Sequence, residues 1–434
     1  MLQVNYIRTH TAEVLHGLKK KNFTSPEFIQ EVIKLDDQRK ELKLQFDLLS
    51  GETKMVAEKI GKLMRGNAQE YDFNLENIEN QKIRLKQRSV EIKEFLKLTT
   101  EQLNLTEASL EKILLQIPNI PHTSVPPGLK PEDNIIISKG GEIPQLYEGA
   151  LPHWELAKKY NLIDFELGNK ITGAGFPVYR GKGAKLQRAL IQFFLDEAEH
   201  AGYEEIQPPI LVNAASGLGT GQLPDKEGQM YFIGADELYL VPTAEVPITN
   251  LYRDTILEEK NLPIKNAGYT PCFRREAGSY GAHVRGLNRL HQFDKVEIVQ
   301  ITHPENSYNV FKEMLLYIQI LLEKLELPYR TLNLCGGDLT FASALTYDLE
   351  VYSAAQERWL EVSSISNFET YQANRLKLRI RNKEGKNQLA HTLNGSALAL
   401  PRIVAALLEN NQDPKGIKIP KVLVPYTKFD RIED

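Results

Sequence analysis

The sequence predicts an α+β protein in which a mainly antiparallel sheet with flanking helices follows a long antiparallel α-helical hairpin. Three observations indicate this fold. Apolar residues recur every seven residues through the N-terminal region, a proline-rich segment interrupts the chain, and strand-like and helical patterns then alternate to the C-terminus. At 434 residues, of which 42% are hydrophobic, the chain can bury the core that such an arrangement needs.

The predicted hairpin begins after Ser25 and Pro26, which suit an N-cap and a first helical position. A heptad spacing keeps one stripe of a helix facing a partner, and it is seen in Leu35, Leu42, Leu49, Val56 and Leu63. Gly66 and Asn67 interrupt this pattern as turn residues. The spacing then resumes in Ile78, Leu85 and Ile92. Two helical limbs joined by a short turn form an antiparallel hairpin.

Two basic clusters lie toward the outer part of the predicted hairpin. The first has a single acid, Glu58, among Lys54, Lys59, Lys62 and Arg65. The second has no acid between its members, which are Lys82, Arg84, Lys86 and Arg88. The charge pattern alone leaves two interpretations open, the solvated faces of a coiled coil or an arm that binds phosphates.

A domain boundary is expected where the hairpin ends, because the segment from Pro118 to Pro131 is rich in proline and therefore stiff and extended. We predict a helical arm at residues 1–117 and a second domain at residues 118–434. Within the second domain we expect helices at 184–201 and 305–325, and a final strand and helix within 391–409. Further strands are expected to end at Pro208 and Pro209 and to lie near 238–241, 268–275, 290–301, 346–351 and 359–364.

Composition narrows the classes of function. Two cysteines, Cys272 and Cys335, provide neither a disulfide framework nor paired zinc-ligand spacing. A net charge of -4 argues against a surface that binds polyanions everywhere, so any contact with nucleic acid must be local. No run of eighteen apolar residues and no secretory signal occurs, so we expect a cytoplasmic protein without a membrane partner.

Arg274 and Arg275 stand where a predicted strand ends and a glycine-bearing loop begins. Guanidinium groups form paired, charge-assisted hydrogen bonds with the oxygens of polyphosphates and carboxylates. Taken alone, this signal is weak, because arginine-rich surface hairpins are common.

The order of the whole stretch from Thr270 to Glu297 resembles the second signature motif of class II aminoacyl-tRNA synthetases, in its serine-specific form. Residues 184–209 are similar to the first motif, which builds the dimer interface in that class, and residues 394–402 are similar to the third. Residues 241–246 and 361–364 match the serine-pocket and metal segments of the seryl enzymes. The hairpin resembles their tRNA-binding arm, so the resemblance covers essentially the full chain.

This resemblance implies a class II antiparallel-sheet catalytic domain that activates L-serine with ATP and transfers the seryl group to the 3′ end of tRNA(Ser). It also implies a homodimer and leaves open whether tRNA(Sec) is a substrate. Arg274 and Arg402 would be catalytic, the first bridging the α-phosphate and the serine carboxylate and the second holding the outer phosphates. The implied ATP site comprises Arg274, Arg275, Glu276, Arg289, Phe293, Glu361, Val362, Ser363, Ser364 and Arg402.

Specific roles follow from the same resemblance. Glu276 would accept from the adenine amino group, Phe293 would stack on the purine, and Glu361 and Ser364 would hold Mg²⁺ through oxygen. The implied serine pocket offers hydrogen bonds that alanine and glycine cannot complete; its members are Thr243, Ala244, Glu245, Arg274, Glu297, Asn394 and Ser396. The implied tRNA contacts are the two basic clusters of the hairpin.

Two departures from the family pattern stand out. Pro401 replaces the usual small glycine, and we predict a helix that starts near Leu400 with Pro401 in its first turn. The less polar residues Ala282, His283 and Val284 occupy the motif-two loop, which puts the details of acceptor-end contact in doubt.

Two other hypotheses compete with synthetase activity. A paralogue that loads a small amino acid onto a carrier protein would lack the long arm. An inactive interaction protein on the same fold would have no need of the charged residues that this chain retains, namely Arg274, Glu276, Glu297, Glu361 and Arg402.

Overall fold

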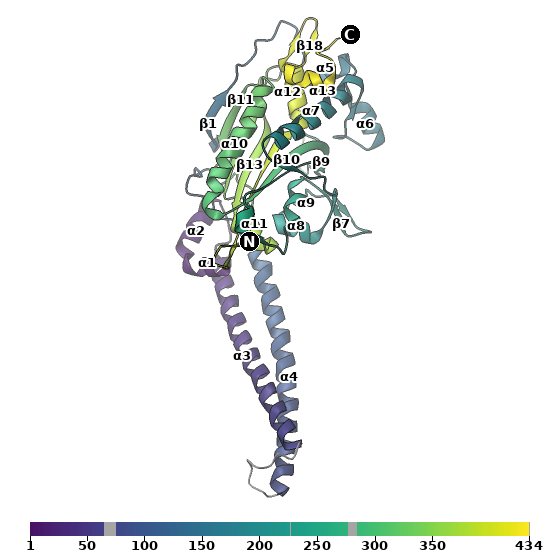
Figure 1. Ribbon diagram of the computed structural model, residues 1–434. Coiled ribbons are helices and arrows are strands. Elements are labelled where there is room, and N and C mark those ends of the chain that lie inside the picture. The colour runs from purple at the N-terminus through teal and green to yellow at the C-terminus, as the bar shows by residue number, and fades with distance from the viewer. Residues whose placement is uncertain (65–74, 226, 277–283, 434) are drawn as a thin grey trace. The chain divides into compact units, whose positions relative to one another are not determined.

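The computed structural model describes residues 1–64, 75–225, 227–276 and 284–433. They form two compact units (Figure 1). One unit comprises Leu2–Leu15 and Thr24–Ile117, and the other comprises Met1, His16–Phe23 and Pro118–Asp434. No helix among the described residues is long and apolar enough to cross a membrane.

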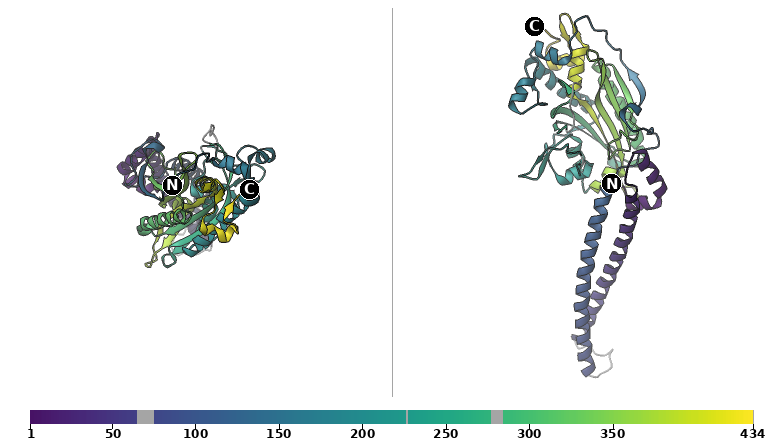
Figure 2. Two further views of the ribbon diagram at one scale, coloured as in Figure 1. Left: turned by 90° about the horizontal axis from the view of Figure 1, so that it is seen from above. Right: turned by 180° about the vertical axis from the view of Figure 1, so that it is seen from behind.

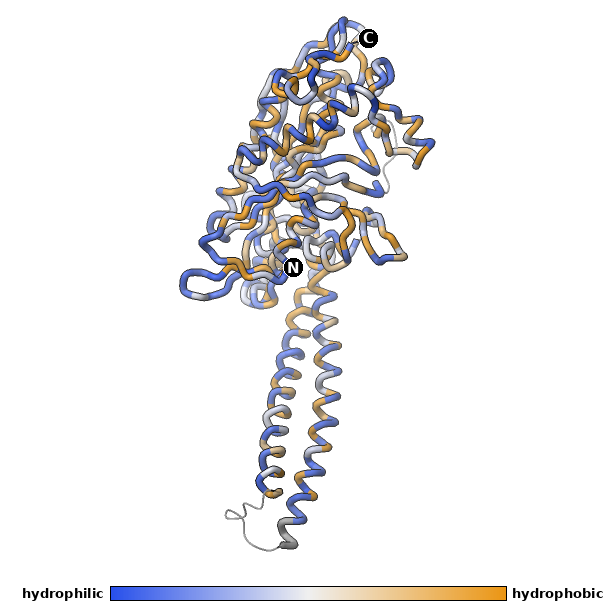
Figure 3. The backbone as a smooth tube through the Cα atoms, turned by 45° about the vertical axis from the view of Figure 1, so that its right-hand side comes forward, coloured by the Kyte–Doolittle hydropathy of each residue, from blue (hydrophilic) through white to orange (hydrophobic). Residues whose placement is uncertain are grey.

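The first unit is dominated by α3 (Glu27–Met64) and α4 (Leu75–Leu114), which lie side by side in both side views (Figures 1 and 2). The predicted heptad stripe is confirmed, since Val56 and Ile92 are buried and Leu35, Leu42 and Leu49 are half-buried. Hydrophilic residues dominate both limbs in Figure 3, with hydrophobic positions recurring between them. A narrow apolar seam therefore joins the limbs. The predicted turn at Gly66 and Asn67 lies outside the described residues.

The second unit is built on an eight-stranded sheet with the order β1-β11-β12-β13-β16-β10-β9-β4. All neighbouring strands pair antiparallel except β4 and β9. In the order of the sheet, the bounds are Ile135–Gly140, Tyr329–Asn333, Leu345–Ser353, Arg358–Glu369, His391–Ala399, Gln292–Thr302, Ile264–Phe273 and Glu204–Glu205. The predicted antiparallel α+β fold is confirmed.

Three amphipathic helices cover this sheet. They are α7 (Gly181–His200), α10 (Ser307–Lys324) and α12 (Leu400–Asn410). Helix α7 packs against β9 and β10, α10 against β13 and β16, and α12 against β10, β12 and β13. Their apolar faces join the sheet in one buried core that includes Phe193, Phe311 and Leu407. The strands that carry the polar residues described below are therefore packed against helices from three separate parts of the sequence.

Shorter elements complete the two units. The remaining helices are α1 (Val4–Thr9), α2 (Thr11–Lys20), α5 (His153–Lys159), α6 (Phe165–Ile171), α8 (Ala214–Thr220), α9 (Glu245–Asn250), α11 (Thr370–Leu376) and α13 (Val424–Thr427). Small sheets are formed by β2 (Ile163–Asp164) with β3 (Val178–Tyr179), and by β5 (Leu211–Asn213), β7 (Leu238–Leu240) and β6 (Phe232–Ile233). Two others contain β15 (Asn387–Leu389), β14 (Arg379–Arg381) and β8 (Ile256–Glu258), and β17 (Gln412–Asp413), β18 (Gly416–Lys418) and β19 (Arg431–Ile432).

Two local predictions at prolines had different outcomes. The strand expected to end at Pro208 and Pro209 is wrong, because β4 ends at Glu205 and residues 206–210 lie outside any strand. Proline has no N–H to donate to a ladder, so the pair marks a break and not a strand end. The expectation for Pro401 is confirmed, since α12 begins at Leu400 and Pro401 lies in its first turn.

Candidate active site

A buried polar cluster lies between β10, β16 and the start of α9. Glu297 on β10 is fully buried, and Asn394 Nδ2 on β16 donates to its Oε1 at 2.8 Å. The same amide donates to Glu245 Oε2 at 3.0 Å, so one side chain bridges two carboxylates. Ser396 Oγ lies 3.4 Å from Glu297 Oε2. Four residues of the predicted serine pocket are thus brought together.

Glu245 is the carboxyl of this cluster whose ionisation its surroundings disfavour. Burial and the nearby charge of Glu297 raise the pKa of Glu245 to about 7, against a hydrogen bond from Gln372 that lowers it. The Gln372 Nε2 to Glu245 Oε1 distance is 2.7 Å. Thr243 Oγ1 accepts from the Glu245 backbone N–H at 3.2 Å, and Ala244 is fully buried beside it. These two pocket residues therefore shape the start of α9.

Lys295 belongs to the same cluster and is not among the site residues predicted from the sequence. Its Nζ lies 2.5 Å from Glu297 Oε2 and 3.2 Å from Ser396 Oγ, and its side chain is only 7% exposed. Lys295 and Glu297 are two residues apart on one strand, which places both side chains on the same face. The two-residue spacing of Lys295 and Glu297 within a predicted strand could therefore have indicated that they pair. The cluster holds two carboxyl groups and one ammonium group, which suits a ligand that carries its own ammonium.

Arg274 lies beside this cluster at the end of β9. Its Nε donates to the Pro242 carbonyl at 3.3 Å, and its guanidinium carbon lies 5.3 Å from the centre of the Phe293 ring. The side chain of Arg275 is exposed, and Glu276 forms an ion pair with Arg289. Five of the residues predicted to bind ATP therefore lie close to the end of β9 and the start of β10. Ala282 and His283 lie outside the described residues, whereas Val284 is described.

Arg402 lies in the first turn of α12, and two backbone carbonyls of other segments accept hydrogen bonds from its guanidinium. Its Nε donates to the Asn288 carbonyl at 3.1 Å, and its Nη1 donates to the Glu361 carbonyl at 2.7 Å. The same guanidinium lies 3.6 Å from the Glu361 carboxylate. The third sequence motif is thus placed against both the second motif and the segment from Glu361 to Ser364.

A bulge in β13 brings Glu361 and Ser364 to one face of the sheet. Asp348 on β12 pairs with Ser364, and Glu350 pairs with Glu361, which leaves Val362 as the extra residue. Because Asp348 and Glu350 share a face, Glu361 and Ser364 share it as well. Burial, together with the charge of Glu361, raises the pKa of Asp348 well above its usual value. Asp348 is not among the site residues predicted from the sequence.

Val362 and Ser363, which lie between Glu361 and Ser364, make contacts inside the protein. Val362 is buried in the core, and Ser363 Oγ donates to the Ser396 carbonyl at 2.6 Å. Oxygen atoms from Glu361, Ser364 and Asp348 match the ligands that Mg²⁺ prefers. Among the described residues, no three His, Cys, Asp or Glu side chains form a complete metal cage. This donor set therefore suits an ion that takes its other ligands from phosphates and water.

The basic residues of the hairpin are partly engaged with acids. Arg88 pairs with Glu52 across the two helices at 2.8 Å and with Glu91 at 3.1 Å. Lys62 lies 3.2 Å from Glu58, and Lys82 lies 3.5 Å from Glu79. Exposed side chains of the two basic clusters are those of Lys54, Lys59, Lys62, Arg84 and Lys86. Arg65 lies outside the described residues.

Comparisons with known proteins identify the family of both parts of the chain. Residues 1–121 match the model of the seryl-tRNA synthetase N-terminal domain, and residues 233–411 match that of the tRNA synthetase class II core domain (G, H, P, S and T). The serine–tRNA ligase of Salinibacter ruber is 47% identical over 100% of this chain and 99% of its own length. That of Akkermansia muciniphila is 44% identical over the same shares.

Solved structures include similar proteins over their whole length. The seryl-tRNA synthetase from Pyrococcus horikoshii complexed with ATP has a TM-score of 0.86 at 30% identity, covering 100% of this chain and 99% of that chain. The cytoplasmic enzyme from Naegleria fowleri in complex with AMP has a TM-score of 0.84 at 26% identity, with the same coverage. Both were determined with an adenine nucleotide bound.

Proposed function

The chain belongs to the seryl-tRNA synthetases, and from this membership we propose which of its residues perform each part of the reaction. It is an aminoacyl-tRNA ligase that activates L-serine with ATP and transfers the seryl group to tRNA. The observation that carries the residue assignment is the bridge that Asn394 makes between Glu245 and Glu297, beside Arg274.

In the proposed pocket, the carboxylates of Glu245 and Glu297 receive the ammonium and hydroxyl groups of serine. Lys295 already compensates Glu297, so the ligand's ammonium balances the second acid, Glu245. Asn394 and Ser396 complete the hydrogen bonds, and Thr243 and Ala244 set the backbone at the start of α9. Alanine or glycine would leave these buried polar groups unpaired, which disfavours their binding strongly.

Adenylation in this proposal depends on positioned charge. A serine carboxylate oxygen attacks the α-phosphorus, the bond from that phosphorus to the β-phosphate oxygen breaks, and pyrophosphate leaves. Arg274 offsets the repulsion between the two anions that approach, and Arg402 binds the outer phosphates. Phe293 stacks on the purine, Glu276 accepts from its amino group, and Arg275, Arg289, Val362 and Ser363 line or support the nucleotide site.

We assign Mg²⁺ binding to Glu361 and Ser364, with Asp348 on the same face. When bound, the ion would neutralise phosphate charge. Mn²⁺ binding measured by electron paramagnetic resonance in the presence of a non-hydrolysable ATP analogue tests this assignment. Glu361→Gln should weaken the binding at least tenfold. Unchanged affinity in that variant would remove Glu361 from the site.

We propose that residues 1–117 bind tRNA and that residues 118–434 carry the catalysis. The exposed basic residues Lys54, Lys59, Arg84 and Lys86 would contact phosphates, together with Lys62, Arg65, Lys82 and Arg88. Phosphate contacts follow backbone shape and not base sequence. We therefore extend the proposal to tRNA(Sec) as a second substrate.

The proposed location of the enzyme is the cytoplasm, where seryl-tRNA is consumed by translation.

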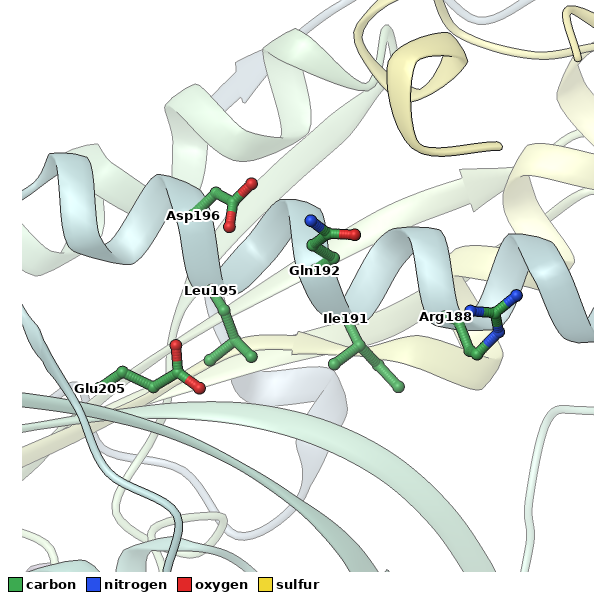
Figure 4. Close-up of a pocket in the computed structure, with 6 residues that line it drawn as sticks. All are labelled: Arg188, Ile191, Gln192, Leu195, Asp196 and Glu205. Carbon is green, nitrogen blue, oxygen red and sulfur yellow. The ribbon is translucent and has the colours of Figure 1, made fainter. Parts of the chain in front are cut away.

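We also propose a homodimer formed through the first motif. A hollow between α7 and β4 is lined by Arg188, Ile191, Gln192, Leu195, Asp196 and Glu205. Ile191 and Leu195 project from α7 on the side where Glu205 lies (Figure 4). A second copy would cover this apolar strip. Light scattering should give twice the monomer mass, and Ile191→Asp with Leu195→Asp should halve it.

Two assays test the residue assignment. Serine-dependent ATP–pyrophosphate exchange should fall by about 10²–10³-fold in Arg274→Ala, because the lost cation acts where charge develops. Arg381→Ala is a matched control, since its exposed side chain pairs only with Glu258 among the described residues, at 3.4 Å. Exchange that persists in Arg274→Ala at the rate of that control would contradict the mechanism.

The arm requires a different measurement. Combined alanine substitutions of Lys54, Lys59, Arg84 and Lys86 should raise the KM for tRNA and flatten its salt dependence. Exchange in the same variant should stay unchanged and serves as the internal control. Charging transcripts of tRNA(Ser) and tRNA(Sec) in parallel tests both substrates. An unaltered KM for tRNA would remove these residues from the interface.

A further inference from the structure

Three consecutive side chains at the start of α5 contact the segment that leads from the motif-two loop into β10. His153 Nε2 accepts from the Leu287 N–H at 2.8 Å. Trp154 lies under the Arg285 guanidinium, 4.8 Å from ring centre to carbon, and Glu155 pairs with Arg285 at 3.2 Å. This short helix therefore forms a platform for one end of the loop.

Gly286 shows how closely the His153 ring approaches that segment. Its φ is +68°, and a Cβ at this position would lie 2.3 Å from His153 Nε2. Neither the backbone conformation nor the space admits another residue without a shift. The imidazole is thus fitted against the backbone of residues 286 and 287.

Glu409 on α12 determines which imidazole nitrogen carries the proton. Both side chains are fully buried, and Glu409 Oε1 lies 2.7 Å from His153 Nδ1. Burial opposes ionisation of Glu409, but hydrogen bonds from His153 and Ser353 outweigh it and lower the pKa of this carboxyl. An ionised Glu409 only accepts, so Nδ1 donates to it. Nε2 therefore keeps the lone pair that receives the Leu287 N–H.

The same glutamate reaches the next residue by a second route. Gln356 Nε2 donates to Glu409 Oε1 at 3.0 Å, and Gln356 Oε1 accepts from Asn288 Nδ2 at 2.8 Å. Leu287 and Asn288 are thus both tied to Glu409, one through His153 and the other through Gln356. The Asn288 carbonyl in turn accepts from Arg402 Nε at 3.1 Å.

We propose that His153, paired with Glu409, is a positioning residue for adenylation. It fixes the backbone at Leu287 and Asn288 so that the Asn288 carbonyl aims the Arg402 guanidinium at the ATP phosphates. This inference rests on the proposed role of Arg402. It assigns no contact with substrate to His153, whose effect must pass through Arg402.

Two isosteric substitutions separate the two hydrogen bonds of the ring. In His153→Asn the amide can still donate to Glu409 but cannot reach Leu287. In His153→Gln the side-chain oxygen can reach the Leu287 N–H, although the donor to Glu409 is lost. Aiming of Arg402 depends on the Leu287 bond, so the Asn variant should be the more impaired. Lys158→Ala, an exposed position on the same helix, is the control.

The assay is ATP–pyrophosphate exchange by the full-length enzyme, with ATP and serine varied separately and active sites counted by the adenylate burst. His153→Asn should raise the KM for ATP about tenfold, because it leaves a buried N–H unpaired. The KM for serine should stay within about twofold, and His153→Gln should remain within about threefold of wild type for ATP. Lys158→Ala should match wild type.

A double variant tests the route through Arg402. Arg402→Ala should raise the KM for ATP, and adding His153→Asn should raise it no further. If Arg402→Ala leaves the KM unchanged, the proposed role of Arg402 fails. If Arg402→Ala raises it but His153→Asn does not, or the two effects multiply, only the positioning role is overturned.

A purely structural role for the pair would give a different pattern. It would lower the melting temperature and the count of active sites while leaving both KM values unchanged, and that result would overturn the inference. Should His153→Asn fail to fold, His153→Phe combined with Glu409→Leu removes both buried polar groups together, which is often neutral for stability. That variant should show the same selective increase in the KM for ATP.

Discussion

Replacing Lys295 by Met should destabilise the catalytic unit strongly while keeping the length of the side chain. The substitution leaves Glu297 fully buried with Glu245 nearby, and no other cation among the described residues pairs with it. At the observed 2.5 Å separation, Coulomb's law with an effective dielectric constant of about 20 gives roughly 7 kcal/mol of attraction. Desolvation of two ions offsets several kcal/mol of that gain, and breaking such a pair costs about 3–5 kcal/mol. We expect a loss of this size.

Urea unfolding followed by tryptophan fluorescence measures this loss. Both tryptophans, Trp154 and Trp359, belong to the same compact unit as Lys295, so the signal reports on that unit. Lys418→Met is the control, since its ion pair with Asp413 spans 3.9 Å and the lysine side chain is 66% exposed. Surface pairs of this kind contribute less than about 1 kcal/mol.

Adding Glu297→Gln to Lys295→Met should recover much of the lost stability, because the uncompensated charge of Glu297 is then removed. An unfolding free energy for Lys295→Met that equals the value for Lys418→Met would refute this reasoning. It would mean that water or a rearranged side chain compensates Glu297.

Three further predictions concern the pocket, the glycines and a thiol. Because burial and Glu297 raise the pKa of Glu245 to about 7, Glu245 is protonated below that pH. Affinity for serine, measured by calorimetry, should therefore rise with pH through about 7, and Glu245→Gln should abolish the rise; equal slopes would contradict the assignment. Gly51→Ala should stabilise α3 by up to about 1 kcal/mol in thermal melts, since its Cβ meets no atom within 4 Å. Gly183→Ala should destabilise by about 1–3 kcal/mol, because its Cβ would lie 2.1 Å from the Leu162 carbonyl oxygen; stabilisation by both glycine variants would refute the contrast. Cys272 is fully buried and burial raises its pKa, so a thiol reagent should modify it only after unfolding; reaction in the native protein would contradict this placement.

The hairpin and the sheet could be predicted because their signals are periodic and local. Leu35, Leu42 and Leu49 indicate a helical stripe without knowledge of the partner helix. Pro401 constrains where α12 begins, and that prediction is confirmed. The strand predicted to end at Pro208 and Pro209 was wrong. Proline has no N–H to donate to a strand ladder, and β4 already ends at Glu205.

The charged partners in the core could not be predicted with the same ease. Lys295 and Glu297 share a strand face, so their pairing was accessible from spacing alone. Asp348 and His153 are different, since Asp348 meets Ser364 only through the register of a bulged strand pair, and His153 meets Glu409 only through the packing of helices distant in sequence. A residue's contacts across such distances depend on tertiary structure, which periodicity does not contain.

The extra residue in β13 allows Glu361 and Ser364, three positions apart, to share one face of the sheet. On a regular strand, residues three positions apart point to opposite faces, so loss of the bulge with Val362 retained would turn one of the two oxygen donors toward the hydrophobic core. Substitution at that position can be tolerated wherever an apolar side chain of similar volume fits. Redesign of this enzyme's nucleotide site can therefore vary the apolar side chain at position 362, provided that the bulge is kept.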